Sequence, residues 1–479
     1  MTKSPRPVPD SALLGQFAAI VGAANALTTR DGAAFAERNA ERRGAFAGKA
    51  AMVLLPGSVA EVSAILKLAA ETGTAIVPQG GNTGLVGGQM PDGSGAEIVV
   101  ALTRLDAIRS VDAATDSMTV DAGVTLAAAR RAAEAADRLF PLAIGSMDHC
   151  QIGGNISSNA GGVAVLAYGN TRDLVLGLEV VLPGGAVWDG LRTLRKDNAG
   201  YDLKHLFIGA EGTLGIVTGA AVKLYPRPRG KATGVAGTAS PAAALTLLHL
   251  AKERAGFELT TFELLPRIAV DFCISHLPGS FDPLPERHAW YVLFEVSSGQ
   301  SEAAASALVD GIVGAARASG IVETGRGAID AAEAASLWRM RYAISDVQRP
   351  EGVSLKHDVS VPVGRVPDFL AAATAAVLAV EPEARPVPFG HLGDGNVHFN
   401  VSQPAGGDPA AFRAKAAAIT DTVHAIVADF GGSIAAEHGI GQMKRALLPT
   451  VRSAVEMELM RAVKTALDPK GIMNPGKVL

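Results

Sequence analysis

Three histidines and a glutamate near the C-terminal end could bind a metal ion and transfer a proton. His391 and His398 lie seven residues apart in a stretch, 389–398, that contains three glycines, and Glu437 and His438 follow about forty residues later. Glycine at this density disfavours a helix, so strand or loop geometry must bring the imidazoles together. Two histidines and a glutamate are an accepted zinc set with an open coordination position, and they suit other divalent metals as well. The alternative is three unrelated histidines, one of them a satisfied core residue.

A second group of residues could hold an anionic small molecule. Arg341 and Ser345 are four residues apart in an expected helix, 331–346, and therefore lie on one face of it. Lys356 follows in an expected strand, 354–361. A guanidinium is well suited to a carboxylate, and a second cation suggests a substrate with two carboxylates. Asn400 is a further candidate. The alternative for Arg341 alone is a solvated helix residue.

Three glycine-rich runs could hold phosphate groups. The first, 77–88, has five glycines in nine positions and follows a short apolar strand; the second is 145–162, and the third comprises 196–203 and 207–217. Glycine tolerates positive φ and allows close approach of a ligand, and successive N–H groups in such turns suit phosphate oxygens. The spacing is not that of a Rossmann fingerprint. Taken alone, the first run is equally consistent with an ordinary surface loop.

In order and spacing, the three runs resemble the FAD-binding domain of the vanillyl-alcohol oxidase/p-cresol methylhydroxylase superfamily. From about residue 54 to the C-terminus the chain is similar to its D-2-hydroxyacid dehydrogenase branch, in which D-2-hydroxyglutarate dehydrogenases fall. The resemblance implies that FAD is bound by Pro78, Gln79, Gly80, Gly81, Asn82, Thr83, Gly84, Gly87, Gly88, Gly145, Ser146, Gly153, Gly154, Asn155, Asn159, Ala160, Gly161, Glu211, Gly212, Ile216 and Asn474. The loop 78–88 contains no His or Cys for covalent attachment, which predicts non-covalent FAD, with His149 as the residue that could contradict this.

The same resemblance assigns roles in the second half of the chain. It implies a divalent metal, with zinc as first choice, on His391, His398 and Glu437, and His438 as general base. It implies that Arg341, Ser345, Lys356 and Asn400 bind the substrate. Two positions depart from the family pattern: Tyr342 follows Arg341 where the family commonly has Glu, and Ser345 stands where it has Thr.

The implied reaction is oxidation of a D-2-hydroxyacid to the 2-oxoacid by hydride transfer to flavin N5. D-2-hydroxyglutarate, giving 2-oxoglutarate, is the first choice, and D-lactate and D-malate are the alternatives. A metal-dependent hydrolase and a non-catalytic flavoprotein subunit are rivals from other classes. Because no NAD fingerprint is present, we expect an electron-accepting flavoprotein or a quinone to reoxidise the flavin.

Composition limits the partners. The 479 residues carry a net charge of −4, which argues against binding to nucleic acid. No apolar run reaches the length of a membrane-spanning helix. The two cysteines fit a reducing cytoplasm, and the apolar residues in 12–21 predict a surface helix capped by Asp10 or Ser11 rather than a signal peptide. A homodimer is left open.

The elements that must position these residues alternate between strands and helices from Met52 onward. Ser58 and Glu61 predict the start of a helix, 183–185 predicts a hairpin turn, and 206–208 is expected to be a strand. We predict an α+β fold: a two-subdomain FAD-binding domain of the superfamily's type, and a cap domain whose antiparallel sheet is covered by helices. The expected segments are 1–226 for FAD, 227–445 for the substrate and metal, and 446–479 returning to the FAD domain.

Overall fold

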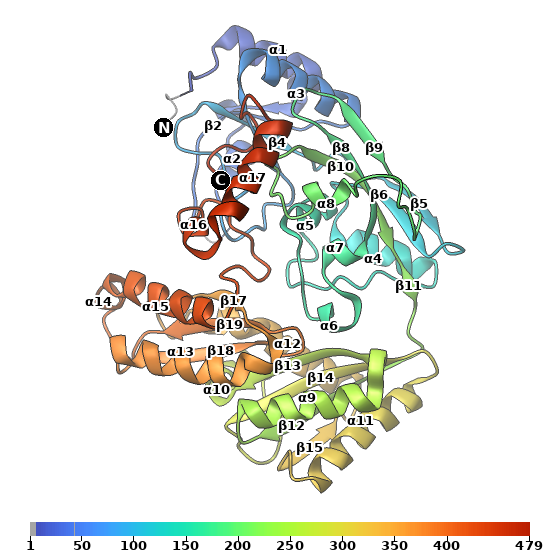
Figure 1. Cartoon of the computed structure of the whole chain (residues 1–479), viewed down its shortest axis with the longest axis vertical. Helices are drawn as coiled ribbons and strands as arrows, with labels where there is room; N and C mark the ends of the chain where they lie inside the picture. The colour runs from blue at the N-terminus through green and yellow to red at the C-terminus, as the bar shows by residue number, and fades with distance from the viewer. Residues whose placement is uncertain (1–5, 43) are drawn as a thin grey trace. The chain divides into compact units, whose positions relative to one another are not determined.

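The computed structural model describes residues 6–42 and 44–479 and divides into two compact units of α+β class (Figure 1). The predicted fold class is confirmed. Unit 1 comprises Met1–Gly161, Asn170–Pro226 and Glu437–Leu479, and unit 2 comprises Gly162–Gly169 and Arg227–Ala436. The three predicted segments, 1–226, 227–445 and 446–479, stay a prediction about domains.

One sheet of unit 1 leads directly into the first glycine run. Three of its strands are parallel, and helix α3 (Val59–Thr72) forms the crossover between the first two of them in the chain. The C-terminal segment adds to the sheet beside Ile76, whose N–H donates to the Ile472 carbonyl at 2.9 Å and whose carbonyl accepts the Asn474 N–H at 2.8 Å. The strands, in spatial order, are β1 (Ala26–Leu27), β2 (Ala50–Leu54), β4 (Glu97–Ala101) and β3 (Ala75–Gln79).

The second sheet of unit 1 is antiparallel. Its outer hairpin turns at 183–185, as predicted. In spatial order its strands are β5 (Ile108–Asp112), β6 (Ser117–Asp121), β10 (Ile216–Lys223), β8 (Val175–Val181) and β9 (Val187–Gly190). The pair β7 (Arg138–Leu139) and β11 (Tyr225–Pro226) stands apart.

Helices of unit 1 cover these sheets with their apolar faces. Ser58 caps α3 as predicted, while the Glu61 carboxylate accepts the Gly57 N–H at 2.8 Å. Val62, Ile65 and Leu66 are fully buried with Phe17 of the first helix, which Asp10 caps. The helices are α1 (Ser11–Val21), α2 (Ala33–Arg38), α3 (Val59–Thr72), α4 (Leu126–Ala135), α5 (Ile152–Ser158), α7 (Thr171–Leu174), α8 (Lys204–Phe207), α16 (Leu448–Val451) and α17 (Ala454–Leu467).

Unit 2 is built on one antiparallel sheet, as predicted for the cap domain. In spatial order its strands are β15 (Thr324–Gly327), β12 (Gly230–Thr238), β14 (Trp290–Ser298), β13 (Leu259–Pro266), β18 (Arg385–His391), β19 (Asn396–Ser402) and β16 (Ser354–Leu355), and β17 (Asp358–Ser360) also pairs with β19. The central strands β13 and β14 are almost entirely buried.

Two sets of helices pack on this sheet. Figure 1 shows α9 and α11 side by side along the strands, and α13 beside α15. Helices α10 and α12 form a further set. They share a core with residues of β13, β14 and β18, including Leu265, Leu293 and Phe389. The helices are α6 (Val165–Tyr168), α9 (Pro241–Ala255), α10 (Arg267–His276), α11 (Glu302–Ala318), α12 (Ala331–Val347), α13 (Val366–Val380), α14 (Pro409–Ala414) and α15 (Ala416–Asp429).

Two local predictions are wrong. Residues 206–208 were expected to be a strand, but Lys204–Phe207 form the helical turn α8. The expected strand 354–361 is two short strands, since Lys356 and His357 interrupt the pairing with β19. This interruption matters because it places Lys356 in a connection rather than in the ladder.

One helical segment, Val363–Val380, is long and apolar enough to cross a membrane by length and composition alone. Core helices of soluble proteins pass the same test. Phe369, Leu370, Ala373 and Val377 of this segment are buried within unit 2. The expectation that the chain has no transmembrane segment stays a prediction.

Candidate functional site

The alternation of side chains along three strands of unit 2 gathers polar groups on one sheet face. Glu263 of β13 is paired with His391 of β18, and Phe389 of β18 is paired with His398 of β19. Since side chains two residues apart share a face, Phe389 and His391 point to the same side as Glu263 and His398. The rings of His391 and His398 lie 5.4 Å apart between centroids. Of the two expected possibilities, strand or loop geometry, it is the pairing of β18 with β19 that brings these imidazoles together.

Glu263 lies at the centre of this cluster and was not among the residues predicted from the sequence. Its side chain is fully buried. One carboxylate oxygen contacts the Arg341 Nε at 2.5 Å, and the other contacts the His391 Nδ1 at 2.6 Å. Burial raises the pKa of Glu263, but the charges and hydrogen bonds of Arg341 and His391 outweigh burial and bring it to about 2. The carboxyl group is therefore ionised at neutral pH. A lone carboxylate inside the apolar run 259–266 was the available signal.

Arg341 is held on α12 against this face. The residue is 5% exposed, its guanidinium lies 5.0 Å from the centroid of the Phe389 ring, and Glu263 binds its Nε. Its NH2 nitrogen is buried and has no hydrogen-bond partner among residues 6–42 and 44–479. A buried charged donor without a partner is costly, so this atom is suited to an anionic ligand.

The other candidate substrate residues lie around the same helix. The Lys356 ammonium donates to the Ser345 carbonyl at 2.8 Å, so these two predicted residues are neighbours. Asn400 is 2% exposed, and its amide donates to the Gln348 side chain at 3.2 Å. Their roles in substrate binding stay predictions.

The predicted metal ligands can reach one another. His391, His398 and Glu437 each offer a ligand atom, and these atoms lie within 4.8 Å of one another. Glu437 is peptide-bonded to Ala436, whose N–H donates to the Asp358 carbonyl on β17, which pairs with β19. A second possible set shares Glu437 and adds Asp358 and His438. The donor types fit a divalent ion, and the second set makes His438 a rival ligand.

The three glycine-rich runs converge within unit 1. A Cβ on Gly81 would lie 1.8 Å from the His149 carbonyl oxygen, and a Cβ on Gly212 would lie 2.9 Å from Pro78. The Glu211 N–H donates to the Ser157 carbonyl, the last turn of α5, at 2.8 Å. Glycine at positions 81 and 212 permits this close approach, so residues 78–81, 149–157 and 211–212 of the three runs lie against one another.

Side-chain hydrogen bonds hold the first glycine-rich loop, 77–88, against neighbouring backbone. Asn82 has a φ of 54° and donates to the carbonyls of Glu37 and Ala40 at 3.0 and 2.9 Å. Gln79 donates to the carbonyls of Arg38 and Gln89 at 3.0 and 3.1 Å. These two predicted FAD residues therefore hold the loop in place through their side-chain nitrogens.

Orphaned polar atoms test whether this surface fits a cofactor. In the described part of the chain, Gln151 Oε1, Asn155 Nδ2 and Asn474 Oδ1 are buried without hydrogen-bond partners. The Asn474 Nδ2 meanwhile donates to the carbonyls of Gly88 and Glu211 at 2.9 and 2.7 Å. Amide groups that are unsatisfied next to glycine loops fit a polar ligand such as FAD. A Cβ on Gly145 or Gly154, unlike one on Gly81 or Gly212, would have no atom within 4 Å.

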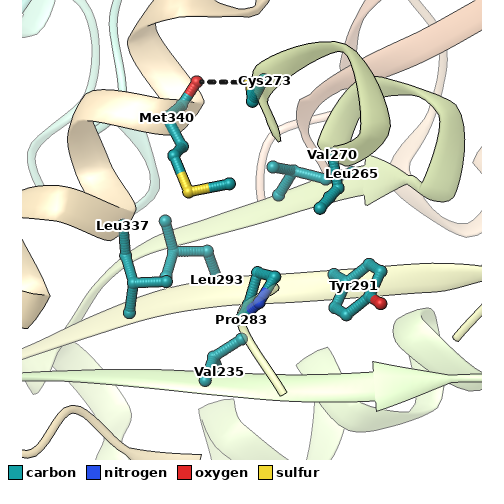
Figure 2. Close-up of a pocket in the computed structure, with 9 residues that line it drawn as sticks. All are labelled: Val235, Leu265, Val270, Cys273, Pro283, Tyr291, Leu293, Leu337 and Met340. Atoms are coloured by element: carbon teal, nitrogen blue, oxygen red, sulfur yellow. Dashed lines mark hydrogen bonds between the residues drawn. The ribbon is translucent and has the colours of Figure 1, made fainter. Parts of the chain in front are cut away.

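Behind α12, unit 2 contains a small apolar cavity of about 20 Å³ (Figure 2). Leu337 and Met340 point into it from α12, opposite Tyr291 and Leu293 of β14. The Cys273 Sγ lies 3.5 Å from the Met340 carbonyl oxygen. A space that holds about one water and is lined by apolar groups has no part in polar chemistry.

Comparisons with known proteins agree with this arrangement. The model of the FAD binding domain matches residues 50–190, and that of the C-terminal domain of FAD linked oxidases matches residues 227–478. D-2-hydroxyglutarate dehydrogenase of Xanthomonas citri pv. viticola is 38% identical over 89% of this chain and 88% of the relative. D-2-hydroxyglutarate–pyruvate transhydrogenase of Saccharomyces cerevisiae is 34% identical over 98% of this chain and 95% of the relative.

Solved structures show the same fold at low sequence identity. p-Cresol methylhydroxylase with substrate bound has a TM-score of 0.76 and 16% identity, covering 98% of this chain and 96% of that one. Alkyldihydroxyacetonephosphate synthase has a TM-score of 0.72 and 17% identity, covering 98% and 86%. The chain thus belongs to the FAD-linked oxidases, as an enzyme of the FAD-dependent D-2-hydroxyacid dehydrogenase branch, and it has the fold of p-cresol methylhydroxylase.

Proposed function

We propose that this enzyme oxidises D-2-hydroxyglutarate to 2-oxoglutarate with non-covalent FAD and a divalent metal ion, zinc being the first choice. The names of the curated relatives support the substrate. The observation that carries the proposal is the buried Arg341, whose NH2 nitrogen lacks a partner among the described residues and which shares Glu263 with His391. A cation for a carboxylate thus lies beside a candidate metal ligand.

The residues of the proposed site would divide the work. Bound FAD supplies the hydride acceptor, and a bound divalent ion supplies a Lewis acid that lowers the pKa of the substrate hydroxyl. His391, His398 and Glu437 would hold the ion. His438 would accept the hydroxyl proton, a task that suits imidazole at neutral pH. The neighbouring Glu437 carboxylate lies 3.8 Å from the His438 Nε2, where it would stabilise the imidazolium that forms.

Glu263 would prepare His391 for its role. Because an ionised carboxylate accepts only, its 2.6 Å contact requires that Nδ1 of His391 carry the proton. Nε2 is then the ring nitrogen that carries the lone pair, as a metal ligand requires. Carboxylate partners of this kind orient histidine ligands and raise their basicity in metal sites.

Arg341 and Lys356 would bind the two carboxylates of the substrate. The side chain of Arg341 is fixed by Glu263 and Phe389, so little conformational entropy is lost on binding. Lys356 is exposed, and its ammonium donates to the Ser345 carbonyl. A rotation of this long side chain would bring the ammonium to a ligand. D-lactate or D-malate is the alternative substrate, and the partial neutralisation of Arg341 by Glu263 favours D-lactate, which has a single carboxylate.

The flavin is proposed to be reoxidised by another flavoprotein or a quinone, in a cytoplasmic enzyme whose two cysteines are free and buried. Pyruvate is a further candidate acceptor, because the yeast relative's name pairs D-2-hydroxyglutarate with pyruvate. Neither the hydrolase nor the non-catalytic subunit is supported by the matches to dehydrogenases.

A substrate panel with an artificial acceptor dye tests the proposal. Purified enzyme is assayed with D-2-hydroxyglutarate, L-2-hydroxyglutarate, D-lactate and D-malate at equal metal loading. We expect the highest kcat/KM with D-2-hydroxyglutarate and no turnover of the L enantiomer. A preference for D-lactate would contradict the dicarboxylate assignment while leaving the D-2-hydroxyacid activity intact.

A further inference from the structure

The loop that follows Glu437 and His438 is bound to the glycine-rich surface of unit 1 by one carboxylate. Glu211 was predicted to contact FAD, but its two carboxylate oxygens accept the N–H groups of Ile440 and Gly441 at 2.7 and 2.8 Å. The side chain is partly buried, and desolvation raises the pKa of Glu211 while these two N–H groups oppose the rise. Each oxygen is therefore matched to one amide of the loop.

Further contacts tie the same loop to the first glycine run. The side-chain NH2 group of Gln442 donates hydrogen bonds to the carbonyls of Gly87 and Met90 at 2.9 and 3.0 Å. Its N–H donates to the Val86 carbonyl at 2.9 Å. The loop thus contacts residues that flank the predicted cofactor surface.

The backbone of this contact is tight on both sides. A Cβ on Gly439 would lie 2.8 Å from a Glu211 oxygen, and a Cβ on Gly441, whose φ is 53°, would lie 2.2 Å from the Val86 carbonyl oxygen. Glu211 itself has a φ of 51°, and its carbonyl accepts from Asn474. A strained residue held by several contacts is a reason to look for function.

We propose that Glu211 is a positioning residue that holds His438 through the backbone of Ile440 and Gly441. The inference rests on the proposed role of His438 as general base. In this arrangement one carboxylate links the flavin-binding surface to the loop that carries the base. Displacement of a catalytic group by even 1 Å can cost on the order of 100-fold in rate, so a link two residues from His438 has kinetic consequences.

Three variants test the proposal. Glu211→Gln replaces one acceptor oxygen with an NH2 group that faces a backbone N–H, so only one of the two bonds can persist. Gln442→Ala removes an independent part of the same attachment. The matched control is Glu61→Gln, because Glu61 likewise accepts one backbone N–H, from Gly57, at the start of α3. All three proteins are assayed with saturating FAD.

Two measurements are made on each protein. Hydrogen–deuterium exchange of peptides covering 437–443 reports the amide bonds directly and does not depend on activity. Anaerobic stopped-flow absorbance separates reduction of the flavin by D-2-hydroxyglutarate from reoxidation by an acceptor dye.

For Glu211→Gln we expect the amides of residues 440–441 to exchange about tenfold faster than in wild type, or more. We expect flavin reduction to be roughly 10–100-fold slower. Reoxidation should stay within about twofold of wild type. Gln442→Ala should show a smaller effect of the same kind, and Glu61→Gln none. Wild-type exchange at 440–441, or equal loss in both half-reactions, would overturn the role of Glu211. If wild-type flavin is not reduced by any D-2-hydroxyacid, the proposed function fails, while the exchange result still decides whether Glu211 holds the loop.

Discussion

Substituting Glu263 by Gln should weaken both metal binding and catalysis, because one buried carboxylate serves Arg341 and His391. The contacts are 2.5 and 2.6 Å long and both are charge-assisted. Each such bond contributes about 1.5–3 kcal/mol, and leaving the partner of a buried ion pair uncompensated costs about 3–5 kcal/mol of stability. Loss of the partner that orients a ligating histidine typically lowers metal affinity by roughly 10–100-fold.

The assay separates these two effects. Chelator-treated protein is titrated with Zn²⁺ and, separately, with Mn²⁺, while bound metal and the rate of flavin reduction are measured on the same samples. Glu263→Gln should raise the metal dissociation constant by about 10–100-fold and lower kcat/KM even at saturating metal, because Arg341 also loses the negative charge of its partner. The control is Glu295→Gln on β14, whose ion pair with Lys231 at 2.8 Å is partly exposed and worth about 0–1 kcal/mol.

One result with Glu263→Gln would contradict a role of this carboxylate in metal binding and catalysis. If Glu263→Gln folds, binds metal as tightly as wild type and keeps the wild-type kcat/KM, the carboxylate is only a structural partner of Arg341. Glu263→Asp adds a check on geometry, since a shorter carboxylate keeps the charge but cannot bridge both partners. It should recover stability more than activity.

Four further predictions follow from the site and its surroundings. Acid or heat precipitation should release all yellow colour to the supernatant; flavin in the washed pellet would contradict non-covalent FAD and point first to His149. Lys356→Met should lower kcat/KM for D-2-hydroxyglutarate by roughly 10–100-fold, with little change for D-lactate, and an equal effect on both acids would refute its contact with a second carboxylate. Glu437→Gln should lose metal and partly recover with added metal, whereas His438→Ala should keep metal and FAD but slow flavin reduction by about 10²–10⁴-fold; loss of metal in His438→Ala would make His438 a ligand. Burial raises the pKa of the Cys273 thiol to about 11 and also raises that of Cys150, so neither should react with iodoacetamide in the folded protein at pH 8, and rapid labelling detected by mass spectrometry would contradict their burial.

Local signals in the sequence were sufficient for much of the fold. The helix caps at Asp10 and Ser58 and the hairpin at 183–185 follow from residue types within a few positions, as does the exclusion of a helix at His391 and His398. These features depend on short-range chemistry, which a single sequence displays. The family resemblance then supplied the cofactor and the reaction class, which no periodicity reveals.

Long-range pairing explains what was missed. Glu263 is 128 residues from His391 in the chain, and only the register between β13 and β18 brings the two side chains together. Likewise, the carboxylate of Glu211 meets the amides of residues 440–441 across 229 and 230 residues. The helical turn α8 was misread as a strand because a short apolar run has no periodicity that distinguishes the two.

The measurement that tests the central claim most directly is a single turnover without oxygen. Enzyme containing oxidised FAD is mixed with D-2-hydroxyglutarate in a stopped-flow instrument, and the flavin absorbance near 450 nm is followed, with 2-oxoglutarate determined at the end. We expect complete bleaching, about one 2-oxoglutarate per flavin, and no bleaching by the L enantiomer at the same concentration. Flavin that stays oxidised with D-2-hydroxyglutarate, D-lactate and D-malate, in protein with full FAD and metal, would contradict the proposed oxidation of a D-2-hydroxyacid.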